Sequence, residues 1–120
     1  MKMQDKIVIN DYIENDPLSE ENLDKALETV NRIRLSFPNK SIWIYNGYKW
    51  SEIFNDGVYL TRECAGWKRR EIVKQCTVMV DGRYIDSQRD ISLRWKGSSN
   101  QRVIDIKKSL QKGEIILWEE

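Results

Sequence analysis

Histidine is absent from this chain of 120 residues, and cysteine occurs only twice, as Cys64 and Cys76. Without histidine the chain has no Ser–His or Cys–His nucleophile. Two thiols also fall short of a four-thiolate zinc site and of the three or four thiolates that iron–sulfur clusters use. We therefore expect no catalytic residue and no metal site within the chain. So few cysteines are typical of a reduced setting, and we expect a cytoplasmic protein.

Long hydrophobic runs are also missing, since no apolar stretch approaches the ~20 residues of a membrane helix. The first residues, MKMQDKIVINDYIEND, are mixed and acidic, so we expect no signal peptide. The net charge is +1, but residues 1–30 hold three Lys and eight Asp or Glu, whereas residues 83–108 hold seven Lys or Arg and three Asp. We interpret the basic tract of residues 83–108 as a solvated loop, with contact to phosphates or to an acidic partner as the alternative. We do not expect nucleic acid to bind.

The apolar pattern predicts alternating strands and helices. Strands are predicted over residues 6–13, 41–45, 76–80 and 114–118, where β-branched and apolar residues cluster. Helical spacing predicts one helix that is capped by Ser19 and ends near Ser36, and a second over residues 67–75. This order argues for one α/β domain, residues 1–120, with a mostly parallel sheet and two main helices.

Three pieces of the sequence resemble one known family. Residues 41–50 (SIWIYNGYKW) are similar to a strand followed by Thr-Gly-Tyr and an aromatic residue, and residues 78–84 (VMVDGRY) to a strand that ends in Asp-Gly-Arg-Phe. The most specific piece is residues 95–105 (WKGSSNQRVID), with its Gly-Ser-Ser-Asn-Gln-Arg run. In this order they resemble the C-terminal half of the anaerobic ribonucleoside-triphosphate reductase activating proteins, of the radical S-adenosylmethionine superfamily. The resemblance implies a truncated half of a radical-SAM-type partial barrel over residues 16–112.

Two departures from the family bear on cofactors. The family holds the amino group of S-adenosylmethionine with a Gly-Gly-Asp-Pro turn, where this chain has residues 14–17 (ENDP). Glycines let a backbone approach a ligand closely, and Glu14 adds bulk and negative charge instead. The family also binds a [4Fe–4S] cluster through a C-x-x-x-C-x-x-C motif that this chain lacks. We therefore expect neither cofactor here, and we interpret both cysteines as ordinary buried thiols.

Half of a barrel implies an exposed strand edge where the missing strands would pair. Residues 1–15, which diverge from the family, are expected to form a replacement strand that covers this edge, and a homodimer is the alternative. Residues 113–120 are expected to form a terminal strand.

Candidate site residues come from the strand ends and from one polar loop. Asp16 lies in the turn that matches the family's S-adenosylmethionine turn, and Asp81 and Arg83 match a strand end that borders the family's cofactor cleft. An ordinary turn with Gly82 at positive φ is the favoured alternative for the latter pair. The resemblance places the polar loop near the cofactor or a partner, and a structural turn is an equal alternative. The loop residues are Ser98, Ser99, Asn100, Gln101 and Arg102.

The resemblance leads to three functional hypotheses. The first is a pseudoenzyme, a protein-binding regulator or inhibitor that docks on the large anaerobic reductase, on which the family generates a glycyl radical. The second is one half of a split activase that a cysteine-bearing chain completes. The third is an inhibitor of an unrelated host protein, such as a defence nuclease, encoded by a phage or mobile element. We adopt the first interpretation and leave the target open between the reductase and an unrelated protein.

Overall fold

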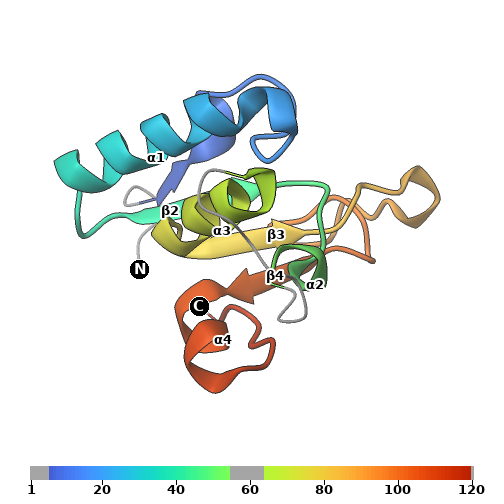
Figure 1. Cartoon of the computed structure of the whole chain (residues 1–120). Helices are drawn as coiled ribbons and strands as arrows, with labels where there is room; N and C mark the ends of the chain where they lie inside the picture. The colour runs from blue at the N-terminus through green and yellow to red at the C-terminus, as the bar shows by residue number, and fades with distance from the viewer. Residues whose placement is uncertain (1–5, 55–63, 120) are drawn as a thin grey trace.

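A four-stranded sheet with helices on one face forms the body of the protein (Figure 1). The computed structural model describes residues 6–54 and 64–119. In spatial order the strands are β1 (Lys6–Val8), β2 (Ser41–Tyr45), β3 (Val78–Asp81) and β4 (Arg102–Asp105). The first three run parallel, and β4 pairs antiparallel with β3. The predicted α/β class with a mostly parallel sheet is therefore confirmed.

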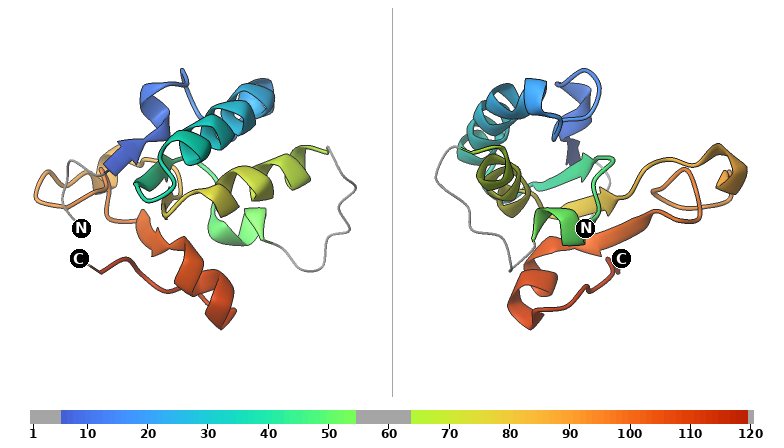
Figure 2. Two further views of the ribbon diagram at one scale, coloured as in Figure 1. Left: turned by 90° about the vertical axis from the view of Figure 1, so that its left-hand side faces the viewer. Right: turned by 45° about the vertical axis from the view of Figure 1, so that its right-hand side comes forward.

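Two helices, α1 (Leu23–Ser36) and α3 (Ala65–Gln75), lie side by side on the same face of the sheet (Figure 2). Each joins two parallel strands, as crossover connections require. The single turn α2 (Trp50–Ile53) follows β2, and α4 (Ile106–Lys112) follows β4. Within the described residues, none of the helices combines the length and the apolar character that crossing a membrane requires.

The first helix begins later than the sequence predicts. Ser19 is not its N-cap, because the Ser19 hydroxyl donates back to the Asp16 carbonyl at 2.8 Å and residues Glu20–Asn22 form a 3-10 turn. The Asn22 side-chain amide donates to the carbonyls of Glu14 and Asp16 at 2.8 and 2.9 Å. These bonds hold the chain in a turn, so the α-helix starts at Leu23.

The outer strands differ from the predicted ones. β1 ends at Val8, because Ile9–Asp11 form a 3-10 turn and the Asn10 side chain bonds to the backbone N and O of Tyr45. In the C-terminal tail, Leu117 alone forms a bridge, with Ile104, although two further backbone hydrogen bonds connect residues 116 and 118 to β4. The tail therefore lies along the edge of β4 without forming a full strand.

Both faces of the central strands are buried. Ile42 and Ile44 of β2 face α1 and α3, whereas Trp43 faces the opposite side together with Val78 and Val80 of β3. This alternation has the period of two that a strand imposes on its side chains. The second face is covered by aromatic side chains from outside the strands, Trp95 and Trp118.

Candidate functional site

An open cleft of about 610 Å³ lies where β2 and β3 end, the position at which open parallel sheets hold their ligands. The loop after β2, the turn after β3 and the start of β4 form its walls. Four predicted site residues line the cleft: Asp81, Arg83, Asn100 and Arg102. The other lining residues were not predicted from the sequence. The lining residues are Gly47, Lys49, Ser51, Glu52, Asp81, Gly82, Arg83, Ile85, Asn100 and Arg102.

Asp81 is the buried anion of this cleft, with 1% of its surface exposed. Its carboxylate accepts hydrogen bonds from Arg102, at 3.0 Å from Nε and 2.5 Å from the second guanidinium nitrogen, and from the backbone N–H of Trp50 at 2.9 Å. The hydrogen bond to Asp81 raises the pKa of Arg102 further above its ordinary value. The two charges therefore satisfy each other at the wall of the cleft, and the N–H at the start of α2 is a further donor to the buried carboxylate.

Asp16 serves the same structural purpose on the other side of β2. One carboxylate oxygen accepts from the backbone N–H of Gly47 at 2.7 Å, and the other accepts from Leu18 N–H at 2.8 Å. The residue before it, Asn15, has a φ of 65°. Asparagine is among the few residues other than glycine that adopt this left-handed region. The turn thus keeps a glycine-like backbone at the position where the resembling family has its second glycine.

Arg83 lines the cleft and is exposed to solvent, with its Cγ 3.3 Å from the position that a β-carbon of Gly47 would take. Gly82 before it has a φ of 89°, which a β-carbon would strain, and its N–H donates to Tyr48 O at 3.1 Å. This is the positive-φ turn at Gly82 that the sequence favoured. The ion pair of Asp81 is formed with Arg102 and not with the nearby Arg83.

The side chains of the polar loop, residues 98–102, bond mainly to groups of the protein itself. The Gln101 side chain accepts at Oε1 from the N–H groups of Gly97 and Ser98, at 2.9 and 3.2 Å, and donates from Nε2 to Gly82 O at 3.1 Å. The Asn100 amide donates to Arg83 O at 2.8 Å. The hydroxyl of buried Ser98 donates to Asn100 Oδ1 and accepts from the N–H of Ile85. Ser99 lies outside the cleft and donates to Gln88 Oε1 at 3.2 Å.

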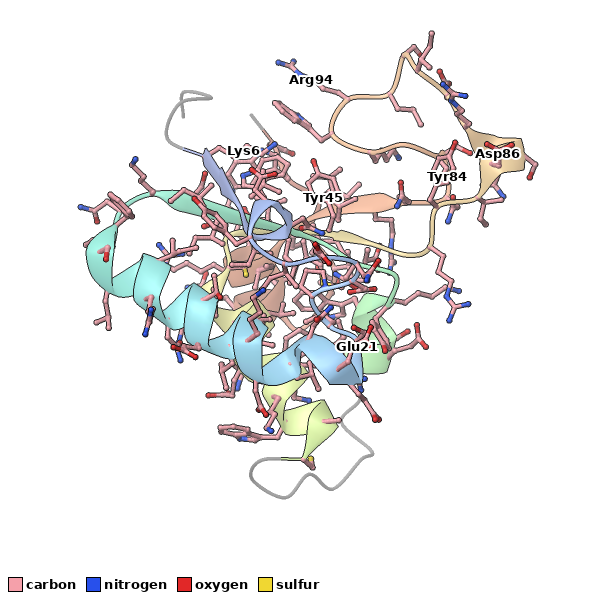
Figure 3. The ribbon with its side chains drawn as sticks, turned by 90° about the horizontal axis from the view of Figure 1, so that it is seen from above. Lys6, Glu21, Tyr45, Tyr84, Asp86 and Arg94 are labelled. Atoms are coloured by element: carbon pink, nitrogen blue, oxygen red, sulfur yellow. The ribbon has the colours of Figure 1, made fainter. Side chains whose placement is uncertain are left out.

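A second depression, of about 860 Å³, lies after β1 and beside the start of α1. Its charged residues are mostly acidic: Asp11, Glu14 and Glu21, with Lys25 as the cation. Figure 3 shows Glu21 near the beginning of α1. Glu21 lines this depression and is not among the residues that line the cleft of β2 and β3. Asn15 lines this depression, whereas the next residue, Asp16, reaches the cleft of β2 and β3 through Gly47. The Asp16 carboxylate and the Arg83 side chain each lie 3.3 Å from the position that a β-carbon of Gly47 would take.

The opposite face of the sheet carries an aromatic cluster that the sequence did not reveal. The Lys6 ammonium lies 3.8 Å from the Trp43 ring centroid and 4.3 Å from that of Trp95, and Tyr45 lies 6.0 Å away (Figure 3). Trp95 has a φ of 72°, an unusual conformation for a bulky residue, and its ring stands 5.1 Å from Trp43. The contacts join residues up to 89 positions apart, which is why no local pattern indicated them.

The cysteines of this chain do not fit an iron–sulfur cluster. Cys64 and Cys76 flank the opposite ends of α3, an 11-residue helix that is roughly 16 Å long. Cys76 is buried and donates to Ile72 O, and burial raises the pKa of its thiol to about 12. Within residues 6–54 and 64–119, no three Cys, Asp or Glu side chains gather as a metal site would need. Two separated thiols, one of them held as the neutral form, cannot ligate a single cluster.

Comparison with known sequences now places the chain in a class. A family model described as "4Fe-4S single cluster domain" matches residues 14–104. The chain belongs to this family of 4Fe-4S single cluster domains. No solved structure matches it.

Its relatives are anaerobic ribonucleoside-triphosphate reductase-activating proteins, so the predicted resemblance is confirmed. The chain is 36% identical over 88 residues to that protein from Escherichia coli K12, which is 73% of this chain and 49% of the relative. It is 34% identical over 86 residues to the Haemophilus influenzae protein, 72% of this chain and 48% of the relative. For the enterobacteria phage T4 protein the values are 31% over 88 residues, 73% and 47%. The chain thus spans about half the length of the curated relatives it matches.

Proposed function

We propose that this chain is a protein-binding relative of the activating proteins, which docks on an anaerobic ribonucleoside-triphosphate reductase and regulates or inhibits its activation. In this proposal it is a pseudoenzyme, which generates no glycyl radical and holds neither a [4Fe–4S] cluster nor S-adenosylmethionine. The observation that carries the proposal is the position of the two cysteines at opposite ends of α3, with Cys76 buried. The family's chemistry depends on a [4Fe–4S] cluster, and the two cysteines of this chain do not fit one.

The strand ends support the same proposal. In the family, the resemblance implies, this edge of the sheet faces the cofactor. In this chain the carboxylates of Asp16 and Asp81 are both bonded to the protein's own N–H groups or to Arg102. Polar groups that are already satisfied gain little by binding a ligand, since each internal bond must first be broken. The residues 98–101 are likewise committed to shaping a loop, which suits a recognition surface better than a reaction centre.

The test uses purified components under anaerobic conditions. The chain is added in increasing excess to the Escherichia coli reductase and its full-length activating protein, and glycyl radical is measured by electron paramagnetic resonance. We expect the radical yield to fall with added chain, and we expect the chain alone to produce none. Direct binding of chain to reductase is measured in parallel by biolayer interferometry. Absence of binding would refute the reductase as target, and would leave an unrelated protein as the partner to identify.

A second candidate is a split activase, and Asn15 is the observation that favours it. Its φ of 65° preserves the backbone shape of a glycine turn although the glycine is gone. If a cysteine-bearing chain completed the protein, mixing this chain with the unmatched half of the Escherichia coli relative would restore radical formation. Iron and sulfide reconstitution of the mixture, followed by absorption and iron analysis, distinguishes the two candidates, since the pseudoenzyme adds nothing to the fragment's cluster or activity.

A further inference from the structure

A third cavity, of about 440 Å³, lies at the end of β3 opposite the cleft of β2 and β3. Thr77, which lines the cavity, precedes the first residue of β3, whereas Asp81, which lines the cleft, is its last residue. The ends of α1 and α3 and the residues of α4 supply the other walls. Cavities of ~300–1,000 Å³ are typical of small-molecule sites, so this one can hold a small ligand.

The charged side chains of this cavity are all cations. Arg34, Lys74 and Lys107 come from three different helices, and none of the described residues that line the cavity is acidic. Cys76 adds no negative charge either, because burial raises the pKa of its thiol to about 12. Like charges around one cavity repel one another, and an anion that binds between them is attracted by all three.

Arg34 is held in place by carbonyl groups. Its guanidinium donates to the carbonyls of Pro38 and Lys40 at 3.1 and 2.8 Å, and to that of Gln75 at 2.7 Å. Carbonyls fix the orientation of the side chain without cancelling its charge, and these bonds leave two of its five N–H groups unused. The protein thus presents a preorganised cation at the wall of the cavity.

The two lysines lie at the mouth of the cavity. The Lys74 ammonium is 3.6 Å from Glu71, a loose ion pair, and its side chain is 52% exposed. Lys107 is exposed on the first turn of α4. The next residue, Lys108, is also exposed but does not line the cavity, because neighbouring residues of a helix point in different directions.

Apolar side chains form the remaining wall. Ile106 and Cys76 are buried, with 1% and 5% of their surfaces exposed, and Leu110 is 41% exposed. A ligand that fits both parts has an apolar or aromatic body and an anionic group. A phosphate monoester matches three cations better than a carboxylate does, since it carries a charge of about −1.5 to −2 at neutral pH.

We propose that this cavity binds a small phosphate monoester, with its phosphate between Arg34, Lys74 and Lys107 and its apolar body against Leu110. The site lies apart from the cleft of β2 and β3, and it does not depend on the proposed function. A ligand that binds the folded chain and not the unfolded chain stabilises the fold.

The test measures binding of phenyl phosphate to the whole chain by isothermal titration calorimetry, with inorganic phosphate and benzoate as comparison ligands. We expect phenyl phosphate to bind several-fold more tightly than either, because only it offers both the charge and the apolar body. Lys107→Glu should weaken its binding at least about fivefold. Lys108→Glu is the matched control, with the same change of charge on the next residue of α4, and should bind like the unmodified chain. Circular dichroism checks that both variants are folded.

Leu110→Ser tests the apolar wall separately. We expect this variant to lose affinity for phenyl phosphate and to keep that for inorganic phosphate. Nuclear magnetic resonance of the unmodified chain locates the ligand: shifts in residues 74–77 and 106–111 support the site, and shifts confined to residues 47–52 and 81–85 contradict it.

Three results would overturn the inference: no binding of phenyl phosphate, equal weakening by Lys107→Glu and Lys108→Glu, or equal affinity for phenyl phosphate and inorganic phosphate. The second would show that net charge alone attracts the ligand, and the third that the apolar wall takes no part. No measurement here contains the reductase. Failure of this site therefore leaves the proposed function standing, and failure of reductase binding leaves the site standing.

Discussion

The carboxylate of Asp81 and the guanidinium of Arg102 face each other across the antiparallel ladder of β3 and β4, joined by two hydrogen bonds of 3.0 and 2.5 Å. The two residues belong to separate motif pieces of the sequence, and their pairing fixes the end of β3 to the start of β4. The pair is asymmetric, because the Asp81 side chain is 2% exposed and that of Arg102 is 40% exposed.

This asymmetry predicts unequal effects of breaking the pair. Arg102→Met leaves a buried carboxylate with only the Trp50 N–H, and should cost about 2–4 kcal/mol of unfolding free energy. Asp81→Asn leaves a guanidinium that can turn to water, and should cost about 1–2 kcal/mol. Urea unfolding of both variants measures the difference. Equal losses would mean that the burial of Asp81 does not govern the stability of the pair.

Gln101→Ala is expected to loosen residues 83–99, the segment that connects β3 to β4, more than it destabilises the protein. The variant removes the acceptor for Gly97 and Ser98 and the donor to Gly82. We expect a loss of about 1–2 kcal/mol in global stability and faster hydrogen exchange in residues 83–99. Ser99→Ala is the control, since the exposed Ser99 hydroxyl makes one bond, at 3.2 Å. The interpretation of the polar loop as a structural clamp fails if the two variants exchange alike.

Cys76 predicts a loss of stability in alkaline solution. Burial raises the pKa of its thiol from 9.0 to about 12, so above pH 9 the unfolded chain releases a proton that the folded chain retains. The contribution of this thiol to the free energy of unfolding is intact below pH 9. It is lost as pH rises toward 12, at up to about 1.4 kcal/mol per pH unit. Denaturant unfolding between pH 8 and about pH 10.5 tests this sign. Cys76→Ala should show a smaller alkaline loss than the unmodified protein, and an unchanged slope would contradict the assignment.

Lys6→Met tests the aromatic cluster on the face of the sheet opposite α1 and α3. The substitution keeps the length of the stem but removes the ammonium that lies over Trp43 and Trp95. We expect a loss of about 1 kcal/mol and a change in tryptophan emission, because both rings lose a cation contact. Lys6→Arg should retain most of the stability. A variant as stable as the parent, with unchanged emission, would show that the cation does not contribute.

Asn15 offers a test of the turn that precedes Asp16. Its φ of 65° lies in the left-handed region, where a β-branched or alanine side chain is strained. Asn15→Ala should destabilise by about 1 kcal/mol, whereas Asn15→Gly should be close to neutral. Thermal unfolding measures both. A larger loss for the glycine variant would mean that the asparagine side chain, and not the backbone shape, holds the turn.

The sequence predicted those elements whose apolar pattern is local. Leu23, Ala26 and Val30 recur at helical spacing and are buried as a stripe, and the apolar run of β2 is buried on both faces. The predicted start of the first helix was wrong, because the side chains of Ser19 and Asn22 bond to the Asp16 carbonyl and hold the chain in a turn before α1. The antiparallel direction of β4 gave no signal either, because strand direction is set by the connection and not by strand composition.

For the candidate site, the residue types could be predicted from the sequence, but their bonding partners could not. The loop residues from Ser98 to Arg102 were singled out, yet their bonds reach to residues 81–88, up to 21 positions away. Lys49 and Glu52, which line the cleft, were not predicted, because only the fold brings α2 to the end of β3.

The segment of residues 83–99, here called the arm, leads back into β3 at one end and into β4 at the other, as Figure 1 shows. A pull on the arm along the strand direction therefore draws both strands the same way and places little load on the ladder between them. The load passes to the parallel pairs from Trp43 with Val78 to Tyr45 with Val80, which resist sliding together rather than one after another. Mechanical force applied at Ile91 is thus carried into the middle of the sheet, to the strand that ends at Asp81.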